Sequence, residues 1–276
     1  MKNFLILCLT ALTAVTSWAE PARPLAADTI PTATGTNAIA RLKADGQFDS
    51  LQAAITAARY DAKADAASGD VFAANPSHGF SSRFSPTGLR LTARTGDGTN
   101  AVRYTSEWRL EAVGYGDALT AVPRGEVVAA GQRVELRRKV PAVVEWFENR
   151  PNGLEHGFTL ADRPAGNSDG QALRVHLAVE GNLQPVVEAG GRKLALRNAG
   201  GATVMTYDKL KVWDATGRQV AAVMEAQPGQ VLLTVLDAEA TYPLTIDPTF
   251  QQEAYVKAST TGRMIGSATP WPCRET

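Results

Sequence analysis

Apolar and polar residues alternate with a period of two along most of the chain beyond about residue 72. In the clearest run, Leu173, Val175 and Leu177 fall on one face, while Arg174 and His176 fall on the other. Such alternation is typical of an antiparallel strand that buries one face and exposes the other. Comparable runs, bounded by turn residues, cover 89–93, 108–113, 134–140, 143–148, 154–160, 194–197, 204–213, 231–236 and 242–246.

Glycine and proline punctuate these runs and predict tight connections. Residues 149–153 (Asn-Arg-Pro-Asn-Gly) and 214–217 (Asp-Ala-Thr-Gly) each predict a hairpin turn. About ten short strands without intervening helices favour packed antiparallel sheets over an α/β core. We therefore predict a mainly β fold over residues 70–248, an antiparallel β-sandwich, enlarged or double. No repeat of roughly 20 to 50 residues occurs in this span, so it is not itself predicted to be a propeller.

The region before the strands has a different character. Residues 20–47 are rich in Ala, Thr and Pro and lack periodicity, which predicts a low-complexity leader. Phe48, Leu51 and Ile55 recur at helical spacing and predict one helix over residues 48–66.

Residues 1–19 have the features of a secretory signal peptide. Lys2 supplies a positive charge, residues 4–15 are apolar, and the small residue Ala19 precedes the expected cleavage point. The alternative, a membrane anchor, needs roughly 20 apolar residues and is disfavoured by the short stretch. Cys8 follows bulky residues, which does not fit a lipoprotein signal. We therefore expect export to the extracellular space or the cell surface, with no transmembrane segment after cleavage.

Composition and charge narrow the range of partners only slightly. The chain has 28 Lys and Arg and 28 Asp and Glu, so no bulk charge indicates nucleic acid or an anionic membrane. Cys273 is the single cysteine left after signal cleavage and cannot form an internal disulfide. We expect no nucleic-acid partner and a fold stabilised by packing.

Two arrangements that suggest catalysis fit other roles better. Residues 166–170 (Gly-Asn-Ser-Asp-Gly) have the spacing of a nucleophile elbow, but a polar loop context replaces the required strand and helix. Glu145 and Glu148 are three apart on a predicted strand, so they point to opposite faces and cannot flank one glycosidic bond. We expect them to solvate the strand edge around Trp146 and Phe147. We predict no catalytic residues and no enzyme activity.

The histidines and one acidic turn are the candidates for metal ligands. His78, His156 and His176 lie far apart in sequence and lack a second ligand at recognisable spacing. His156 is predicted to be a half-buried hairpin histidine. Residues 97–100 (Asp-Gly-Thr-Asn) resemble a fragment of a calcium loop, yet they hold one carboxylate and are explained by a turn. We predict neither a metal nor a cofactor in this chain.

Aromatic residues on the predicted strands raise the alternative of a glycan-binding surface. Trp108, Trp146 and Trp213 are the candidates for ligand-facing side chains. In a sandwich, aromatic residues more often pack in the core or on a sheet face. The wider aromatic set on the strands also includes Tyr115, Tyr207 and Tyr242.

Three segments of the chain resemble a known family. They are 145–160 (EWFENRPNGLEHGFTL), 207–218 (YDKLKVWDATGR) and 240–248 (ATYPLTIDP). They are similar to the amino-terminal β-rich region of large exported bacterial proteins that continue into FG-GAP repeats, which are integrin-alpha-like β-propeller repeats. The resemblance covers roughly residues 70–262 and implies a module in front of a propeller. It carries no catalytic residues over to this chain.

The resemblance continues into a candidate first repeat at residues 249–262. Residues 254–262 (AYVKASTTG) are similar to the opening of an FG-GAP repeat, but residues 263–276 form an aberrant tail without the expected turn, Phe-Gly pair and apolar strand. Synonymous codons for the tail can be chosen so that another frame encodes Asn-Asp-Arg-Phe-Gly-Asp-Ala-Val-Ala-Val-Ser-Gly-Asp, which supplies all three. We therefore expect a truncated or frameshifted front of a longer protein, with any calcium-binding loops in the absent repeats.

These expectations combine into a functional prediction. We expect a non-catalytic, exported structural or adhesion-type module that precedes an FG-GAP propeller in a larger surface protein. Its partner is an unidentified extracellular protein or glycan. A carbohydrate-binding β-sandwich is the alternative. A hydrolase is the second alternative, and it would need carboxylates or a Ser-His-Asp group that the fold brings together.

Overall fold

The computed structural model describes residues 34–96, 99–166 and 170–253. The predictions for the signal peptide at 1–19, and for everything after Glu253, therefore concern residues outside the described part of the chain. None of the described helices is long and apolar enough to cross a membrane.

Two helices precede the strands. The chain divides at Ser50 into two units, so α1 (Thr36–Ala44) belongs to the first and α2 (Phe48–Ala58) extends into the second. α1 lies inside the segment predicted as a leader, so the prediction of a single helix before the strands is wrong. None of its residues is buried. α2 begins at the predicted residue but is shorter than expected, since the chain has already entered β1 (Lys63–Ala64) before residue 66. Leu51 and Ile55 are exposed, at 43% and 58%, and Phe48 is partly exposed.

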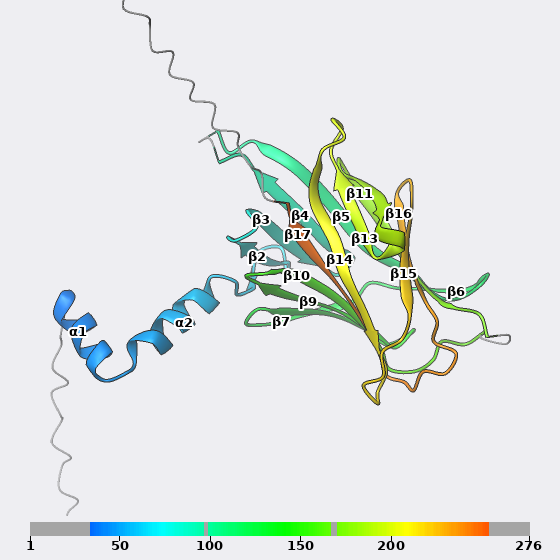
Figure 1. The fold of residues 1–276 in the computed structure, drawn as a ribbon, viewed down its shortest axis with the longest axis horizontal. Helices are drawn as coiled ribbons and strands as arrows, with labels where there is room; N and C mark the ends of the chain where they lie inside the picture. The colour runs from blue at the N-terminus through cyan, green and yellow to red at the C-terminus, as the bar shows by residue number, and fades with distance from the viewer. Residues whose placement is uncertain (1–33, 97–98, 167–169, 254–276) are drawn as a thin grey trace, which may run out of the picture. The chain divides into compact units, whose positions relative to one another are not determined.

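The strands form two antiparallel sheets that face each other (Figure 1), which confirms the predicted β-sandwich. Sheet A has nine strands in the order β1-β2-β3-β4-β5-β11-β16-β15, with β6 also pairing with β5. Sheet B has eight strands in the order β12-β13-β14-β17-β10-β9-β8-β7. Besides β1, sheet A contains β2 (Val71–Asn75), β3 (Phe80–Ser85), β4 (Gly88–Arg94), β5 (Val102–Tyr115), β6 (Ala118–Ala121), β11 (Leu173–Gly181), β15 (Ala222–Gln227) and β16 (Gln230–Val235). Sheet B contains β7 (Glu126–Ala130), β8 (Arg133–Arg138), β9 (Val143–Arg150), β10 (Gly153–Leu160), β12 (Gln184–Glu188), β13 (Lys193–Arg197), β14 (Thr203–Trp213) and β17 (Leu244–Gln252), and the 3-10 turn η1 (Ala189–Gly191) lies between β12 and β13.

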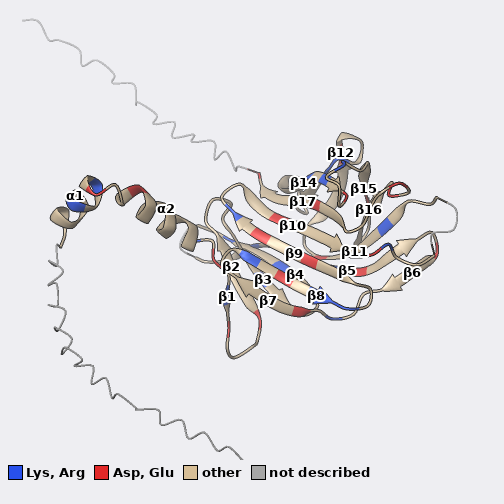
Figure 2. Ribbon diagram, turned by 90° about the horizontal axis from the view of Figure 1, so that it is seen from below, with Lys and Arg blue, Asp and Glu red and all other residues tan. Residues whose placement is uncertain are grey.

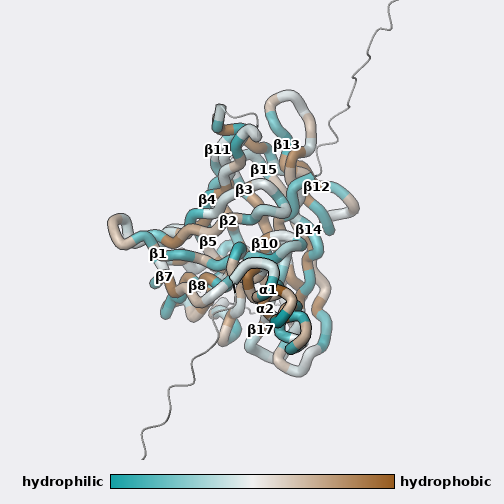
Figure 3. Tube along the Cα trace, turned by 90° about the vertical axis from the view of Figure 1, so that its left-hand side faces the viewer, coloured by the Kyte–Doolittle hydropathy of each residue, from teal (hydrophilic) through white to brown (hydrophobic). Residues whose placement is uncertain are grey.

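The alternation that predicted the strands is visible along them as bands of polar and apolar residues (Figure 3). Every predicted run overlaps an observed strand, although the runs at 134–140, 231–236 and 242–246 extend beyond the strand bounds by one or two residues. The strands that were not predicted have a weaker pattern. In β2, for example, the large apolar Phe72 is exposed while the polar Asn75 is buried. Hydrophobicity alone therefore gives no alternating signal there.

One of the two predicted hairpin turns joins strands that pair. β9 and β10 are hydrogen-bonded neighbours, with Arg150 opposite Gly153. At 214–217, in contrast, Trp213 makes only an isolated bridge to Gln219. The next strand, β15, belongs to sheet A, whereas β14 belongs to sheet B. The second turn therefore begins a crossover between the sheets, and its prediction as a hairpin between paired strands is wrong.

β17 extends the sandwich beyond its predicted end at residue 248. The strand continues to Gln252 and lies between β14 and β10, in the middle of sheet B. Phe250 is fully buried, and its ring centroid lies 4.9 Å from that of Trp108 in sheet A. Residues 249–252 thus form part of a strand of the sandwich, which extends four residues beyond the predicted end.

Aromatic rings join the two sheets in the core. The ring centroids of Phe84 in sheet A and Phe147 in sheet B are 4.9 Å apart. Trp108 in sheet A lies at the same distance from Tyr207 in sheet B. Tilted aromatic pairs at this separation stabilise the fold by more than the burial of their surface area alone. The two sheets therefore share one apolar core.

Two buried asparagines connect the sheets at the β9–β10 turn. The Nδ2 of Asn75 on β2 donates to Oδ1 of Asn149 on β9 at 2.8 Å. The Nδ2 of Asn149 in turn donates to the carbonyl oxygens of Ala74 at 2.7 Å and Tyr60 at 2.9 Å. A buried amide is stable only when its polar atoms are paired. These bonds therefore fix the position of β2 against β9.

A buried carboxylate connects the sheets at the opposite end of β10. Asp237, after β16, accepts hydrogen bonds at Oδ2 from the Tyr115 hydroxyl at 2.6 Å and the Tyr242 hydroxyl at 2.7 Å. Arg163, which follows β10, donates to the same oxygen at 2.8 Å. Burial raises the pKa of Tyr115, so its hydroxyl keeps the proton that it donates. The connections after β10 and β16 are thus tied to β5.

On the outer face of sheet B, an indole fills the space above a glycine. Trp146 on β9 lies opposite Gly157 on β10, and a Cβ at Gly157 would be 2.0 Å from the indole ring. The Trp146 Nε1 donates to Thr159 Oγ1 at 3.2 Å. The Arg133 guanidinium lies 4.6 Å from the ring centroid. Trp146 is therefore enclosed by its own sheet and one arginine.

Gly157→Ala should lower the free energy of unfolding by about 1–3 kcal/mol, because its methyl group needs the space of the Trp146 indole. Urea unfolding followed by tryptophan fluorescence measures the change. Gly96→Ala is the matched control, since nothing lies within 4 Å of a Cβ at that position. Equal unfolding midpoints for the two variants would contradict this account of the indole.

Candidate functional site

A carboxylate and a histidine lie together in the core. Glu145 on β9 and His156 on β10 are both 0% exposed, and Oε1 of Glu145 lies 2.9 Å from Nε2 of His156. Glu145 pairs with Phe158, two residues from His156, so both groups point to the inner face of sheet B. The Phe147 ring stacks on the imidazole with centroids 4.6 Å apart. The pair is therefore surrounded by the apolar core.

Two further groups extend this pair into a buried network. Arg138 on β8 places Nη2 2.9 Å from Oε2 of Glu145, and the exposed fraction of its side chain is 1%. Its Nε donates to the carbonyl oxygen of Pro123 at 2.9 Å. On the other side, the Tyr207 hydroxyl on β14 lies 3.0 Å from Nδ1 of His156. We call Arg138, Glu145, His156 and Tyr207 the core network.

The pKa shifts indicate how protons are arranged in the core network. Burial lowers the pKa of His156, which favours the neutral imidazole. Burial raises the pKa of Tyr207 well above its usual value, so the phenol keeps its proton. Tyr207 then donates to Nδ1 of His156, and the proton on Nε2 is donated to Glu145. Both ring nitrogens are occupied, and the Glu145 carboxylate faces Arg138.

The core network corrects two predictions. Glu145 does not solvate a strand edge, because it is buried in an ion pair with Arg138. His156 is fully buried and not half-buried. The prediction that Glu145 and Glu148 point to opposite faces is confirmed, since Glu148 lies on the outer face and pairs with Arg133 at 3.1 Å. The network joins strands of one sheet and contributes to the fold.

The predicted ligand-facing tryptophans occupy different environments. Trp108 is 0% exposed and donates from Nε1 to Ser106 Oγ at 2.8 Å inside the core. Trp146 is 6% exposed beneath Arg133. Neither side chain faces solvent, so the core or sheet-face alternative applies to both. Trp213, at the end of β14, is partly exposed.

The remaining sequence candidates are separated in the structure. His78 accepts the backbone N–H of Gln252 at Nδ1, at 3.1 Å, and His176 lies 3.3 Å from Gln230 on sheet A. Within the described residues, no group of three or more His, Cys, Asp or Glu side chains could hold a metal ion. The central residues of the Gly-Asn-Ser-Asp-Gly segment, 167–169, and the first two of the acidic turn, 97–98, lie outside the described residues.

Arginines from neighbouring strands gather on the outer face of sheet A. Arg83 on β3 lies directly opposite Arg90 on β4, and Arg90 lies opposite Glu107 on β5. Like charges on directly opposed positions are unfavourable unless other groups neutralise them. The Nε of Arg83 donates to Asp70 at 2.7 Å, and Nη2 of Arg90 lies 2.7 Å from Glu107. Each arginine is thus held by a carboxylate on a different side.

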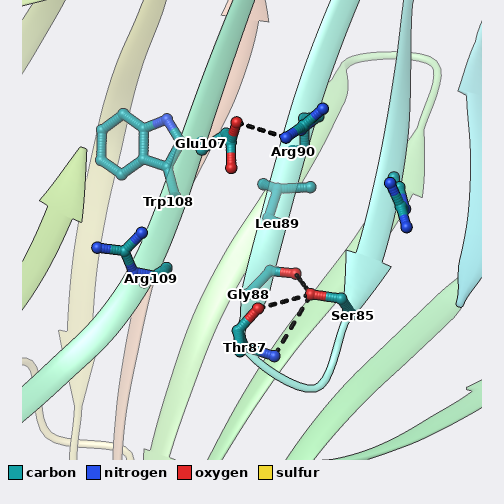
Figure 4. A pocket seen from close by; sticks show the side chains of 9 residues that line it. Ser85, Thr87, Gly88, Leu89, Arg90, Glu107, Trp108 and Arg109 are labelled. Carbon is teal, nitrogen blue, oxygen red and sulfur yellow. Dashed lines mark hydrogen bonds and ion pairs between the residues drawn. The ribbon is translucent and has the colours of Figure 1, made fainter. Parts of the chain in front are cut away.

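A glycine creates a hollow between these arginines. Gly88 has φ 155°, and a Cβ there would lie 2.1 Å from the carbonyl oxygen of Trp108, so no side chain fits. The hollow has a volume of about 200 Å³. Figure 4 shows Arg90 and Arg109 on two sides of it, with the Ser85 and Thr87 hydroxyls hydrogen-bonded at 2.8 Å beside Gly88.

A second hollow continues the first where β5 changes partners. β5 pairs with β4 through Trp108 and with β6 only from Ala112 onward, so residues 109–111 of β5 pair with neither strand on that edge. This hollow has a volume of about 290 Å³ and shares the lining residues Thr87 and Arg109 with the first. We call the two hollows together the arginine groove. Its charged and hydroxyl-bearing lining consists of Arg83, Arg90, Arg109, Arg124, Glu107, Glu111, Ser85 and Thr87.

The arginine groove has more positive than negative lining groups, although the whole chain has a formal net charge of zero. Figure 2 shows the charged residues interspersed along the strands. Nη2 of Arg109 lies 2.7 Å from Glu180 and 3.6 Å from Glu111. The hydrogen bond to Glu180 raises the pKa of Arg109, so this group stays charged. A guanidinium has five N–H donors, and these ion pairs use only part of them.

Sequence reasoning missed the arginine groove for a specific reason. Its arginines come from separate runs, and their proximity depends on the registers of β3, β4 and β5. Gly88 also gives no signal by itself, because the chain contains 24 glycines. Arg90 alternates with Leu89 and Leu91, which marks it as outward-facing, but this does not identify its neighbours.

Comparisons with known proteins assign no family to the chain. No protein-family model matches the chain, and a search of curated proteins found no match.

Removal of the charge in the core network should be far more costly than removal of a surface charge. We expect Glu145→Gln to lower the free energy of unfolding by about 3–5 kcal/mol, because Arg138 would keep its charge without a buried counter-ion. For Glu135→Gln on the outer face we expect a loss below about 1 kcal/mol. Urea unfolding at neutral pH measures both. A similar small loss for the two variants would show that the buried pair is not a constraint on the fold.

A second unusual carboxylate lies on the outer face of sheet B. Asp247 on β17 lies opposite Lys211 on β14 in the strand register. Burial raises the pKa of Asp247 to about 6, and the charge of Glu155 adds to the rise. Its Oδ1 is buried and has no hydrogen-bond partner among the described residues. The charged form of Asp247 is therefore unfavourable at neutral pH.

The sign of the pH dependence follows from this shift. As the pH falls through about 6, folded Asp247 takes up a proton before the unfolded chain does, so its contribution to stability rises as the solution is acidified. Asp247→Asn should therefore stabilise the protein by about 1 kcal/mol at about pH 7.5, allowing for screening by solvent, and by much less at about pH 4.5. Urea midpoints at the two pH values test this, with Asp117→Asn in an exposed turn as the control. A gain that is equal at both values would rule out the charge as its cause.

Proposed function

We propose that this chain is a non-catalytic, exported module of structural or adhesion type, which binds an extracellular partner through the arginine groove. The observation that carries the proposal is the groove itself. Charged side chains from three neighbouring strands surround a hollow that a glycine keeps open. Such a shallow polar surface on a closed sandwich fits contact with a large partner.

The construction of the sandwich supports a role as a rigid platform. The aromatic core, the Asn75–Asn149 pair and the Asp237 cluster connect sheet A to sheet B at several points along the strands. Binding sites that rest on strands are positioned more accurately than sites on loops. The core network contributes to the same rigidity, because its histidine and carboxylate are engaged inside the fold.

The proposal also includes a place in a larger protein. The signal peptide expected at 1–19 fits export, and the three segments that resemble FG-GAP proteins fit a module in front of a propeller. In such an arrangement the arginine groove would supply a contact in addition to those of the propeller.

Retention on the cell surface tests the proposal. The exported chain, fluorescently labelled, is added to cells of the producing organism whose own copy of the gene is deleted. We expect saturable binding that unlabelled protein displaces. The double variant Arg90→Ala and Arg109→Ala should bind at least about tenfold more weakly, a change of about 1.4 kcal/mol, because both guanidiniums line the groove.

Arg174→Ala is the matched control for this experiment. Arg174 is exposed on β11 of the same sheet, and it does not belong to the lining of either hollow. Its loss should change retention by less than about twofold. Non-saturable retention, or equal retention of the groove variant and the native chain, would contradict the proposed function.

A further inference from the structure

The lining of the arginine groove combines cationic donors with anionic and hydroxyl acceptors. Arg83, Arg90 and Arg109 offer cationic N–H donors. Glu107 and the hydroxyl of Thr87 offer acceptors in the same hollow. A ligand that uses both carries anionic groups together with hydrogen-bond donors, and sugar hydroxyls are one such kind of donor.

We infer that the arginine groove binds an acidic polysaccharide, through carboxylate or sulfate groups on its sugar residues. This inference rests on the proposed function and names the partner of the same site. Guanidinium groups present a planar fork of donors that matches oxyanions with two hydrogen bonds. The sugar hydroxyls have acceptors in Glu107 of the first hollow and Glu111 of the second.

The shape of the groove fits a chain better than a single small anion. The two hollows measure about 200 Å³ and about 290 Å³ and meet at Thr87 and Arg109. Arg83 and Arg90 line only the first, and Arg124 lines only the second. Cationic groups thus recur along the face of sheet A, with Glu107 and Glu111 between them. This arrangement suits a polymer whose anionic groups alternate with hydroxyl groups.

The fixed positions of the arginines favour binding as well. Each of Arg83, Arg90 and Arg109 is already held by a carboxylate, at 2.7 Å in each case. A side chain that is ordered before binding loses less conformational entropy when the ligand arrives. The exposed fractions of the three side chains, 37% to 47%, leave them accessible. The bare backbone at Gly88 lets a sugar ring approach between them.

The charges of the groove argue against nucleic acid. A nucleic acid presents a continuous row of phosphates, and proteins that bind it usually carry a strong positive excess. Here Glu107 and Glu111 interrupt the arginines. Single strands also need exposed aromatic rings for stacking, whereas Trp108, the aromatic residue at this hollow, has its side chain in the core.

Affinity electrophoresis of the exported chain in about 150 mM salt tests the inference. The gels contain polygalacturonate, dextran sulfate, neutral dextran or duplex DNA. We expect retardation by polygalacturonate, by dextran sulfate or by both, and none by neutral dextran. Retardation by only one acidic polymer identifies carboxylate or sulfate as the recognised group.

Variants separate a built site from simple charge attraction. Arg109→Ala should weaken the binding of the retained polymer at least about tenfold. Arg109→Lys keeps the charge but loses the planar fork, and it should weaken binding by about threefold or more. Arg174→Ala, with the same loss of charge on the same sheet, should stay within about twofold of the native chain. Matching urea midpoints confirm that the variants are folded.

Several results would overturn the inference. Equal retardation by duplex DNA and by the acidic polysaccharides would show non-specific attraction, as would an equal loss for Arg109→Ala and Arg174→Ala. No retardation by either acidic polymer, with saturable retention on cells that protease treatment abolishes, would identify a protein partner. The proposed function would then stand while the polysaccharide is excluded. If the native chain itself shows no saturable retention on cells, the proposed function is contradicted.

Discussion

The buried charge of Glu145 is the constraint on which the organisation of sheet B depends. An isolated carboxylate in an apolar core costs several kcal/mol, so its partners must be present together. They come from different strands: Arg138 from β8, His156 from β10 and, through the imidazole, Tyr207 from β14. A shift of one residue in any of these strands would turn a partner to the outer face. The network therefore specifies which register sheet B adopts.

The arrangement of the two faces of the sandwich explains where surface chemistry is found. The large aromatic side chains, including Trp108 and Phe250, are used to join the sheets. What remains for the outer face of sheet A is a set of long, charged side chains that pair across strands. Gly88 interrupts this layer, since its position next to the Trp108 carbonyl excludes any side chain. The close approach of the β4 and β5 backbones requires glycine at position 88, and the same glycine lines the surface hollow.

The period-two pattern was sufficient to predict the fold class, because burial of one face is what defines such strands. The same pattern also places Glu145 on the inner face of β9, because it lies at alternate positions along the strand with the buried Val143 and Phe147. The charge of the residue suggested solvent, yet the register placed it inside. Short strands such as β2 and the arginine groove could not be predicted. They depend on which strands become neighbours, and Arg83 and Arg90 meet only through pairing of β3 with β4.

The central position of β17 has a consequence for how the chain acquires its structure. This strand, Leu244–Gln252, pairs with β14 on one side and with β10 on the other. Sheet B therefore remains split into two parts until residues near the end of the described chain are available. During synthesis from the amino terminus, the gap between β10 and β14 stays unfilled until Leu244–Gln252 has been made. Among the described strands of sheet B, β17 is the last in chain order, so β10 and β14 are bridged only after the other strands of the sheet have been made.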